Sequence, residues 1–303
     1  MKNLLLLALS LCSVTALANN VSAEISSSDL NIQGDAFGNQ IRIDRTVNGV
    51  RVVGLNGTLV NGRPSVAFVS GPLVNITMLM DAGDDAVTFR NVTNLGDVIL
   101  SAGDGNDTIT VNGSGSETNL DLKGEAGNDR IFVTNSTVLG DLRMDGGIGA
   151  NTLRATNSSA GNNLSAFGGD LADRIDLSGL RIGGNLEVFA DKGNDVVNVT
   201  TAAVGLSAVV STDEGLDRLA LSGIQTGQDF VIETGAQNDV ASLTNILSAG
   251  SIGISLDSGN DQLTATNVQA QLDAVAIGGA GSDRFTRTAF GGFNKTEVVE
   301  FEF

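Results

Sequence analysis

The sequence predicts an all-β fold: a right-handed parallel β-helix of about ten 22-residue coils with atypical terminal caps. An aspartate returns every 22 residues, apolar residues alternate within each unit, and Gly or Asn returns at fixed unit positions. A fixed period of this size is typical of stacked repeat architectures. No helical periodicity is long enough for βαβ crossovers, so identical unit positions should stack coil over coil. The general rule for parallel crossovers predicts the right-handed turn.

The repeating aspartates define the register of the chain. Successive members lie 22 residues apart, or 44 apart where Asn151 takes the place of an acid. Ten units keep this register without an insertion or deletion. The aspartates are Asp85, Asp107, Asp129, Asp173, Asp195, Asp217, Asp239, Asp261 and Asp283.

Each unit carries two short segments that alternate apolar and polar residues. We number unit positions 1 to 22, with the aspartate at 22. Positions 2 and 4 are apolar, as in Ile109 and Val111, and positions 13 and 15 repeat the pattern, as in Leu120 and Leu122. Alternation at a spacing of two predicts strands with one buried face.

Two unit positions predict sharp corners between these strands. Position 6 is Asn or Gly in eight of nine units, and Thr201 is the exception. Position 20 is Gly at 83, 105, 127, 149, 193, 215, 259 and 281. Both residue types tolerate a left-handed backbone, which turns the chain without steric cost.

The chain divides into four predicted segments. Residues 1–18 form a signal peptide, with Lys2, an apolar run from Leu4 to Leu11, and the small-residue cleavage site Ala16-Leu17-Ala18. Residues 19–80 form an N-terminal cap with degenerate coils, residues 81–283 the regular repeats, and residues 284–303 a C-terminal capping strand. The apolar run is too short to span a membrane. We therefore expect an exported protein that is extracellular, on the cell surface or in the periplasm, without a transmembrane segment after signal removal.

Charge and composition exclude several kinds of function. The net charge is −18, and it becomes −19 once Lys2 is removed with the signal. Such a balance argues against nucleic acid and anionic membranes as partners. There is no His, and the one cysteine, Cys12, lies in the predicted signal, which removes imidazole and thiolate chemistry. We expect no enzyme activity. The alternative is a carbohydrate-active enzyme, a polysaccharide lyase or hydrolase on a β-helix scaffold, because two carboxylates at a set distance suffice for glycoside hydrolysis.

The turns resemble the calcium-binding RTX repeats of secreted bacterial proteins. Gly278-Gly279-Ala280-Gly281-Ser282-Asp283 has the GGxGxD form of that family, although the period here is 22. The resemblance implies Ca²⁺ at the turns. The implied metal ligands are Asp107, Asp129, Asp195, Asp261 and Asp283.

The whole coil resembles a second group of proteins. The stretch from Ile182 to Asp195 is similar to the 22-residue GxGND-type repeats of large, uncharacterised bacterial surface and secreted proteins. The Asn residues at position 6 are similar to the asparagine ladders of pectate-lyase-like β-helices. The resemblance implies a structural, adhesive or surface module, and open coil ends would allow end-to-end or cell-surface association.

The stacked aspartates require compensation. Neighbours about 5 Å apart repel by about 1 kcal/mol in water and by about 3 to 4 kcal/mol at an effective dielectric constant of 20. Ca²⁺ between the turns would offset this repulsion. Alternatively, each carboxylate accepts backbone N–H groups, or its pKa is raised so that it stays protonated.

Overall fold

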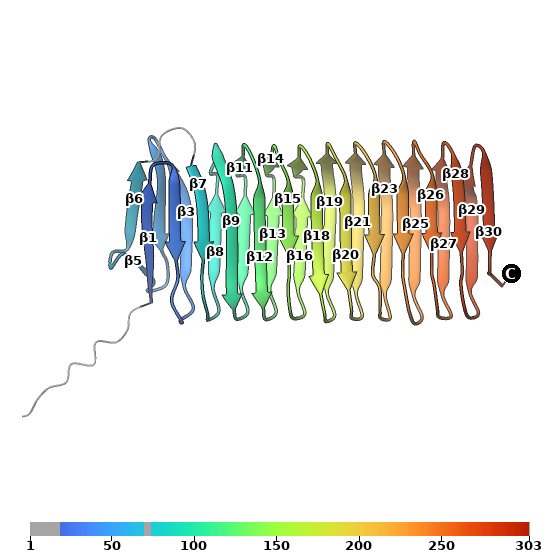
Figure 1. Ribbon diagram of the computed structural model, residues 1–303, viewed down its shortest axis with the longest axis horizontal. Coiled ribbons are helices and arrows are strands. Elements are labelled where there is room, and N and C mark those ends of the chain that lie inside the picture. Colours follow the sequence, from blue (N-terminus) through green and yellow to red (C-terminus); the bar gives the residue numbers. More distant parts are fainter. Residues whose placement is uncertain (1–18, 70–73, 303) are drawn as a thin grey trace, which may run out of the picture.

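The computed structural model describes residues 19–69 and 74–302, and the predicted signal peptide lies outside these ranges. The described chain winds into one elongated rod in which strands run side by side from the N-terminal to the C-terminal end (Figure 1). It contains strands and turns but no helix, so none of its elements is a helix able to cross a membrane. The predicted fold class, an all-β parallel β-helix with a 22-residue coil, is confirmed.

Two columns of strands form the walls of the rod, and each strand pairs in parallel with the strand one coil further along. Ile109 pairs with Ile131, and Leu120 pairs with Leu142, each 22 residues on. The first column contains β3 (Gln40–Thr46), β8 (Ala86–Arg90), β10 (Thr108–Asn112), β13 (Arg130–Thr134), β16 (Thr152–Thr156), β19 (Arg174–Ile182), β21 (Val196–Val204), β23 (Arg218–Thr226), β25 (Val240–Ser248), β27 (Gln262–Ala270) and β29 (Arg284–Gly292). The second contains β2 (Asp29–Gln33), β7 (Val74–Leu79), β9 (Leu95–Asp104), β12 (Leu120–Ala126), β15 (Leu142–Asp145), β18 (Leu164–Gly169), β20 (Leu186–Asp191), β22 (Ala208–Ser211), β24 (Phe230–Glu233), β26 (Ile252–Ser255), β28 (Asp273–Ile277) and β30 (Lys295–Val299).

A third, shorter wall lies between the other two. In the early coils it consists of the two-residue strands β11 (Gly115–Ser116), β14 (Thr137–Val138) and β17 (Ser159–Ala160). From β19 onward it merges with the first column into strands of nine residues. The core runs along the axis and is filled from the predicted positions 2, 4, 13 and 15. Ile109, Val111, Leu120 and Leu122 are all buried.

The predicted corners are present. All nine residues at position 6, from Asn91 to Asn267, have a positive φ between 49° and 66°, and Thr201 adopts it too. At position 20, six of the eight glycines have a positive φ, for example 146° at Gly105. A further corner lies at position 18, where φ is positive in every unit: at Asp81, Gly103, Glu125, Gly147, Gly169, Asp191, Asp213, Gly235, Asp257 and Gly279.

Antiparallel strands cover the N-terminal end of the rod. Strand β1 (Asn20–Ser26) pairs with β2, while β4 (Gly49–Gly54) pairs with β3 on one side and with β6 (Ser65–Val69) on the other. The short β5 (Leu59–Val60) pairs with β1. These pairings satisfy the outer edges of the first coil, which is how solenoid caps prevent edge-to-edge association.

The C-terminal end differs from the N-terminal end. Residues Lys295–Val299 form β30, which lies in register on β28 with Asp273 opposite Lys295, so this segment extends the coil by one rung. No further described strand pairs with β30 on its other side. Phe290 and Phe301 pack against Phe285 there, and Phe293 is 88% exposed.

Candidate functional site

The candidate site is the column of aspartates at position 22, which points into the rod. The column includes every residue for which Ca²⁺ binding is predicted: Asp107, Asp129, Asp195, Asp261 and Asp283. Each aspartate side chain of the column is at most 3% exposed, and so is that of Asn151. Carboxylates are almost never buried this completely unless they are paired.

The local chain explains why these side chains face inward. Asp107 follows the corner at Gly105 and precedes β10, and residues two apart on an extended chain share a face. Asp107, Ile109 and Val111 therefore all point to the core. The same spacing of two residues between the aspartate and the buried apolar residues recurs in each coil, so the carboxylates form one row along the axis.

One oxygen of each carboxylate caps the backbone of the preceding coil. The N–H of Asp85 donates to Oδ1 of Asp107 at 2.7 Å, and the N–H of Asp107 donates to Oδ1 of Asp129 at 2.7 Å. Equivalent bonds of 2.5 to 2.9 Å continue from Asn39 to Asp283. The structure thus shows the backbone-capping arrangement, in which the side chain of one coil satisfies an amide at the corner of the coil before it.

The second oxygen, Oδ2, is buried and has no hydrogen-bond partner in any of the nine aspartates. A buried acceptor of this kind costs free energy if the group is charged. Asn151 shows what surrounds this position. Its Nδ2 donates to the carbonyl oxygens of Gly149 at 3.0 Å and Gly168 at 3.2 Å.

Asp129 lies in the same surroundings as Asn151, one coil earlier. A Cβ placed on Gly146 would be 2.6 Å from both Asn151 Nδ2 and the Gly168 carbonyl oxygen. A Cβ placed on Gly124 would likewise be 2.3 Å from Asp129 Oδ2 and 2.6 Å from the Gly146 carbonyl oxygen. Oδ2 of Asp129 therefore lies near the Gly146 carbonyl oxygen, in the position where the hydrogen-bond donor Nδ2 of Asn151 lies near the Gly168 carbonyl oxygen one coil later.

A protonated carboxyl group meets this requirement, because its O–H donates where the Asn151 amide donates. Burial raises the pKa of Asp129 to about 6, against the partial opposing effect of the Asp107 amide hydrogen bond. Burial raises the pKa of Asp195 to about 7, and the neighbouring Asp217 adds to the rise. The pKa values of Asp85, Asp107, Asp173, Asp217, Asp239 and Asp261 are raised by the same main cause to about 6 or 7.

The column supplies few carboxylate oxygens to any one calcium ion. Ca²⁺ takes six to eight oxygen ligands at 2.3–2.6 Å, from carboxylates, backbone and amide carbonyl groups and water. Each coil supplies one unpartnered carboxylate oxygen, since Oδ1 is bonded to an amide. Within residues 19–69 and 74–302 no three acidic, His or Cys side chains converge on one point. Ca²⁺ binding by these aspartates stays a prediction, and a proton satisfies the observed geometry without an ion.

Two further side-chain ladders lie on the outside of the rod. At position 12, Asp97 Oδ1 accepts the N–H of Asn119, and Asn119 Oδ1 accepts the N–H of Asp141. At position 21 the same pattern joins Asp84 to Asn106 and Asn106 to Asn128. The alternating acids and amides of position 12 were visible in the sequence, whereas the position 21 ladder was missed although the recurrent Asn-Asp pair signals it.

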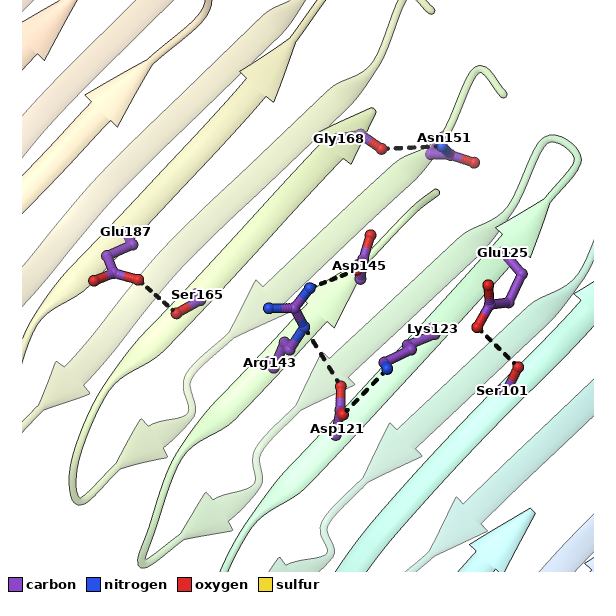
Figure 2. A network of polar contacts seen from close by, with 10 residues as sticks. All are labelled: Ser101, Asp121, Lys123, Glu125, Arg143, Asp145, Asn151, Ser165, Gly168 and Glu187. Atoms are coloured by element: carbon purple, nitrogen blue, oxygen red, sulfur yellow. Dashed lines mark hydrogen bonds and ion pairs between the residues drawn. The ribbon is translucent and has the colours of Figure 1, made fainter. Parts of the chain in front are cut away.

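A denser polar network lies on the outer face of the second column (Figure 2). Arg143 bonds Asp145 at 2.6 Å and approaches Asp121 at 3.6 Å, while Lys123 lies 3.7 Å from the same Asp121. The Arg143 guanidinium also lies 4.3 Å from the ring centre of Phe167. These acids are each paired with a cation on an exposed sheet, so the network is a set of surface ion pairs.

A groove of about 540 Å³ runs along five coils of the third wall. Arg181 is the one charged residue that lines it, and no carboxylate does. The lining thus offers one basic group, Arg181, and not the pair of carboxylates that glycoside hydrolysis uses.

The chain was compared with protein-family models, with curated proteins and with solved structures, and it matches none of them.

Proposed function

We propose that the chain is an exported, acidic β-helix rod that acts as a structural or adhesive module at the cell surface or in the extracellular space. The observation that supports this most is the uninterrupted stacking of coils. From β8 to β29 each first-column strand pairs with the next in constant register, and no loop projects between them. Binding and catalytic residues are usually placed on such loops, and a spacer does not need them.

The rod is also bonded along its axis by side chains. Inward aspartates at position 22 and outward residues at positions 12 and 21 each hydrogen-bond the backbone one coil away. Stability in such arrays is approximately a sum of coil terms and nearest-neighbour terms. Each coil therefore stabilises the next, which suits a chain that bears load or holds a partner at a distance.

The two ends of the rod differ, and the C-terminal end favours a second copy of the chain as the partner. Antiparallel strands cover the N-terminal end, whereas β30 leaves an unpaired edge in the described chain beside the exposed Phe293. Unpaired strand edges recruit other strands. We propose association through the C-terminal coil, in which the same surface of two copies meets.

The function is tested in the cells that produce the chain. Antibody labelling of intact cells and of the culture medium should detect it outside the cytoplasm, and deletion should weaken attachment or the surface layer. Recovery of the chain in the cytoplasmic fraction would refute export. Turnover of a polysaccharide by the purified protein would favour the enzyme alternative instead.

A further inference from the structure

Four arginines gather on one face of the N-terminal cap. Arg42, Arg45, Arg51 and Arg90 line a pocket of about 420 Å³ together with Asp44 and Asn91. The chain has 13 arginines and a net charge of −18, so this concentration of positive charge contrasts with the rest of the molecule. The pocket lies where the N-terminal cap meets the first regular repeat, and its arginines take part in none of the side-chain ladders described above.

Strand register brings these side chains together from distant parts of the sequence. Asp44 on β3 lies opposite Arg51 on the antiparallel β4 and opposite Arg90 on the parallel β8. Arg42 precedes Asp44 by two residues and therefore shares its face of the strand. Two guanidinium groups thus bind one carboxylate, and a third arginine, Arg90, lies opposite it in the strand register.

Asp44 compensates only part of this charge. Arg42 binds it through Nε at 2.8 Å and Nη2 at 2.9 Å, and Arg51 adds one bond from Nη2 at 3.2 Å. Those contacts lower the pKa of Asp44, so the carboxylate stays ionised. The Arg90 side chain is exposed, and its guanidinium group has no hydrogen bond or ion pair with any described residue. Within residues 19–69 and 74–302, Arg51 donates one of the five N–H groups of its guanidinium, to Asp44.

We propose that this arginine pocket binds a tetrahedral oxyanion, the phosphate group of a small soluble ligand. The guanidinium fork matches phosphate oxygens in a bidentate manner. A phosphate monoester carries nearly two negative charges near neutral pH, which suits an excess of arginines better than a single carboxylate does. The pocket volume lies in the range of small-ligand sites. The strongly negative remainder of the chain repels extended anionic surfaces, so a membrane headgroup is disfavoured as the source.

Isothermal titration calorimetry of the full chain with inorganic phosphate at low ionic strength tests this site. Wild type should bind phosphate, and Arg90→Gln and Arg51→Gln should each raise the Kd by about tenfold. Arg218→Gln is the matched control, because Arg218 is also exposed on a first-column strand without an ion pair in the described chain. It removes the same charge and should change the Kd by less than about twofold.

Three results would overturn the proposal: no heat with phosphate in the wild type, equal affinities of the wild type and Arg90→Gln, or equal loss in Arg218→Gln. Acetate in place of phosphate tests the class of anion, and equal binding of acetate would refute the tetrahedral assignment. Sedimentation with vesicles of phosphatidylcholine and phosphatidic acid tests the source, and co-sedimentation would refute a soluble ligand. Circular dichroism of each variant shows that the β fold is retained.

Discussion

Replacement of Asp129 by Asn tests the state of the inward column directly. The surroundings of Asp129 match those of Asn151, with Gly124 and Gly146 as the equivalent neighbours. In Asp129→Asn, Oδ1 can keep the bond from the Asp107 N–H, and Nδ2 can donate to the Gly146 carbonyl as Asn151 does to Gly168. The variant therefore has a neutral donor at every pH, at a place where the wild-type carboxyl donates only while it is protonated, below its raised pKa.

The expected effect depends on pH and follows from the raised pKa of Asp129, about 6 in the fold against an ordinary value of 3.8. Below pH 3.8 the folded and unfolded chains both carry the proton, so variant and wild type should be equally stable. Between pH 3.8 and 6 the unfolded chain loses the proton first, which lowers the stability of the wild type. Above pH 6 the variant should be more stable by on the order of 3 kcal/mol, and the difference should stay constant.

Urea unfolding of both proteins at several pH values measures this difference. Asp97→Asn is the matched control, since Asp97 belongs to the outward ladder in which Asp and Asn already alternate. That change should alter the free energy of unfolding by less than about 0.5 kcal/mol at each pH. A loss of stability in Asp129→Asn at pH 8, or a difference that does not vary with pH, would refute a raised pKa of the buried Asp129 carboxyl.

Three other predictions address packing, metal and association. In urea unfolding, Gly124→Ala should destabilise the fold by about 1–3 kcal/mol, because the added Cβ would meet Asp129 Oδ2 and the Gly146 carbonyl oxygen. The control Gly253→Ala should leave the stability unchanged, because its Cβ would meet nothing within 4 Å. Equal effects of the two variants would contradict the packing. A chelator should leave the melting temperature unchanged, whereas a fall together with calorimetric Ca²⁺ binding would assign the column to calcium. Sedimentation velocity should show concentration-dependent dimers that Phe293→Ser weakens, and a monomer at every concentration would contradict association through the C-terminal coil.

The period and its alternation were sufficient to predict the strands and the corners at positions 6 and 20. The corner at position 18 was missed because its residues are mixed. Asp81, Glu125 and Asp191 adopt a positive φ there, although such residues rarely do so. Their conformation is imposed by neighbouring coils, since parallel pairing on both sides fixes the path of the turn, and propensity alone carries no such signal.

The inward direction of the aspartates was available in the sequence but was not used. Asp107 has the same parity as the apolar Ile109 and Val111, which is enough to place its side chain in the core. The hydrogen bonds of the two carboxylate oxygens were not predictable, because they depend on the spacing between coils. The arginine pocket was not predictable either, since the register of β3 with β4 and β8 decides which arginines meet.

A carboxyl-detected ¹³C NMR titration of aspartate-labelled protein tests the central claim most directly. If the inward column is held neutral by burial, the carboxyl resonances of Asp129 and Asp195 should titrate near pH 6 and 7, and their shifts at pH 5 should be those of protonated groups. The Asn151→Asp variant should add one more resonance of this kind. Titration of all these carboxyl groups near pH 4 would show that burial does not raise their pKa values, and it would contradict the account.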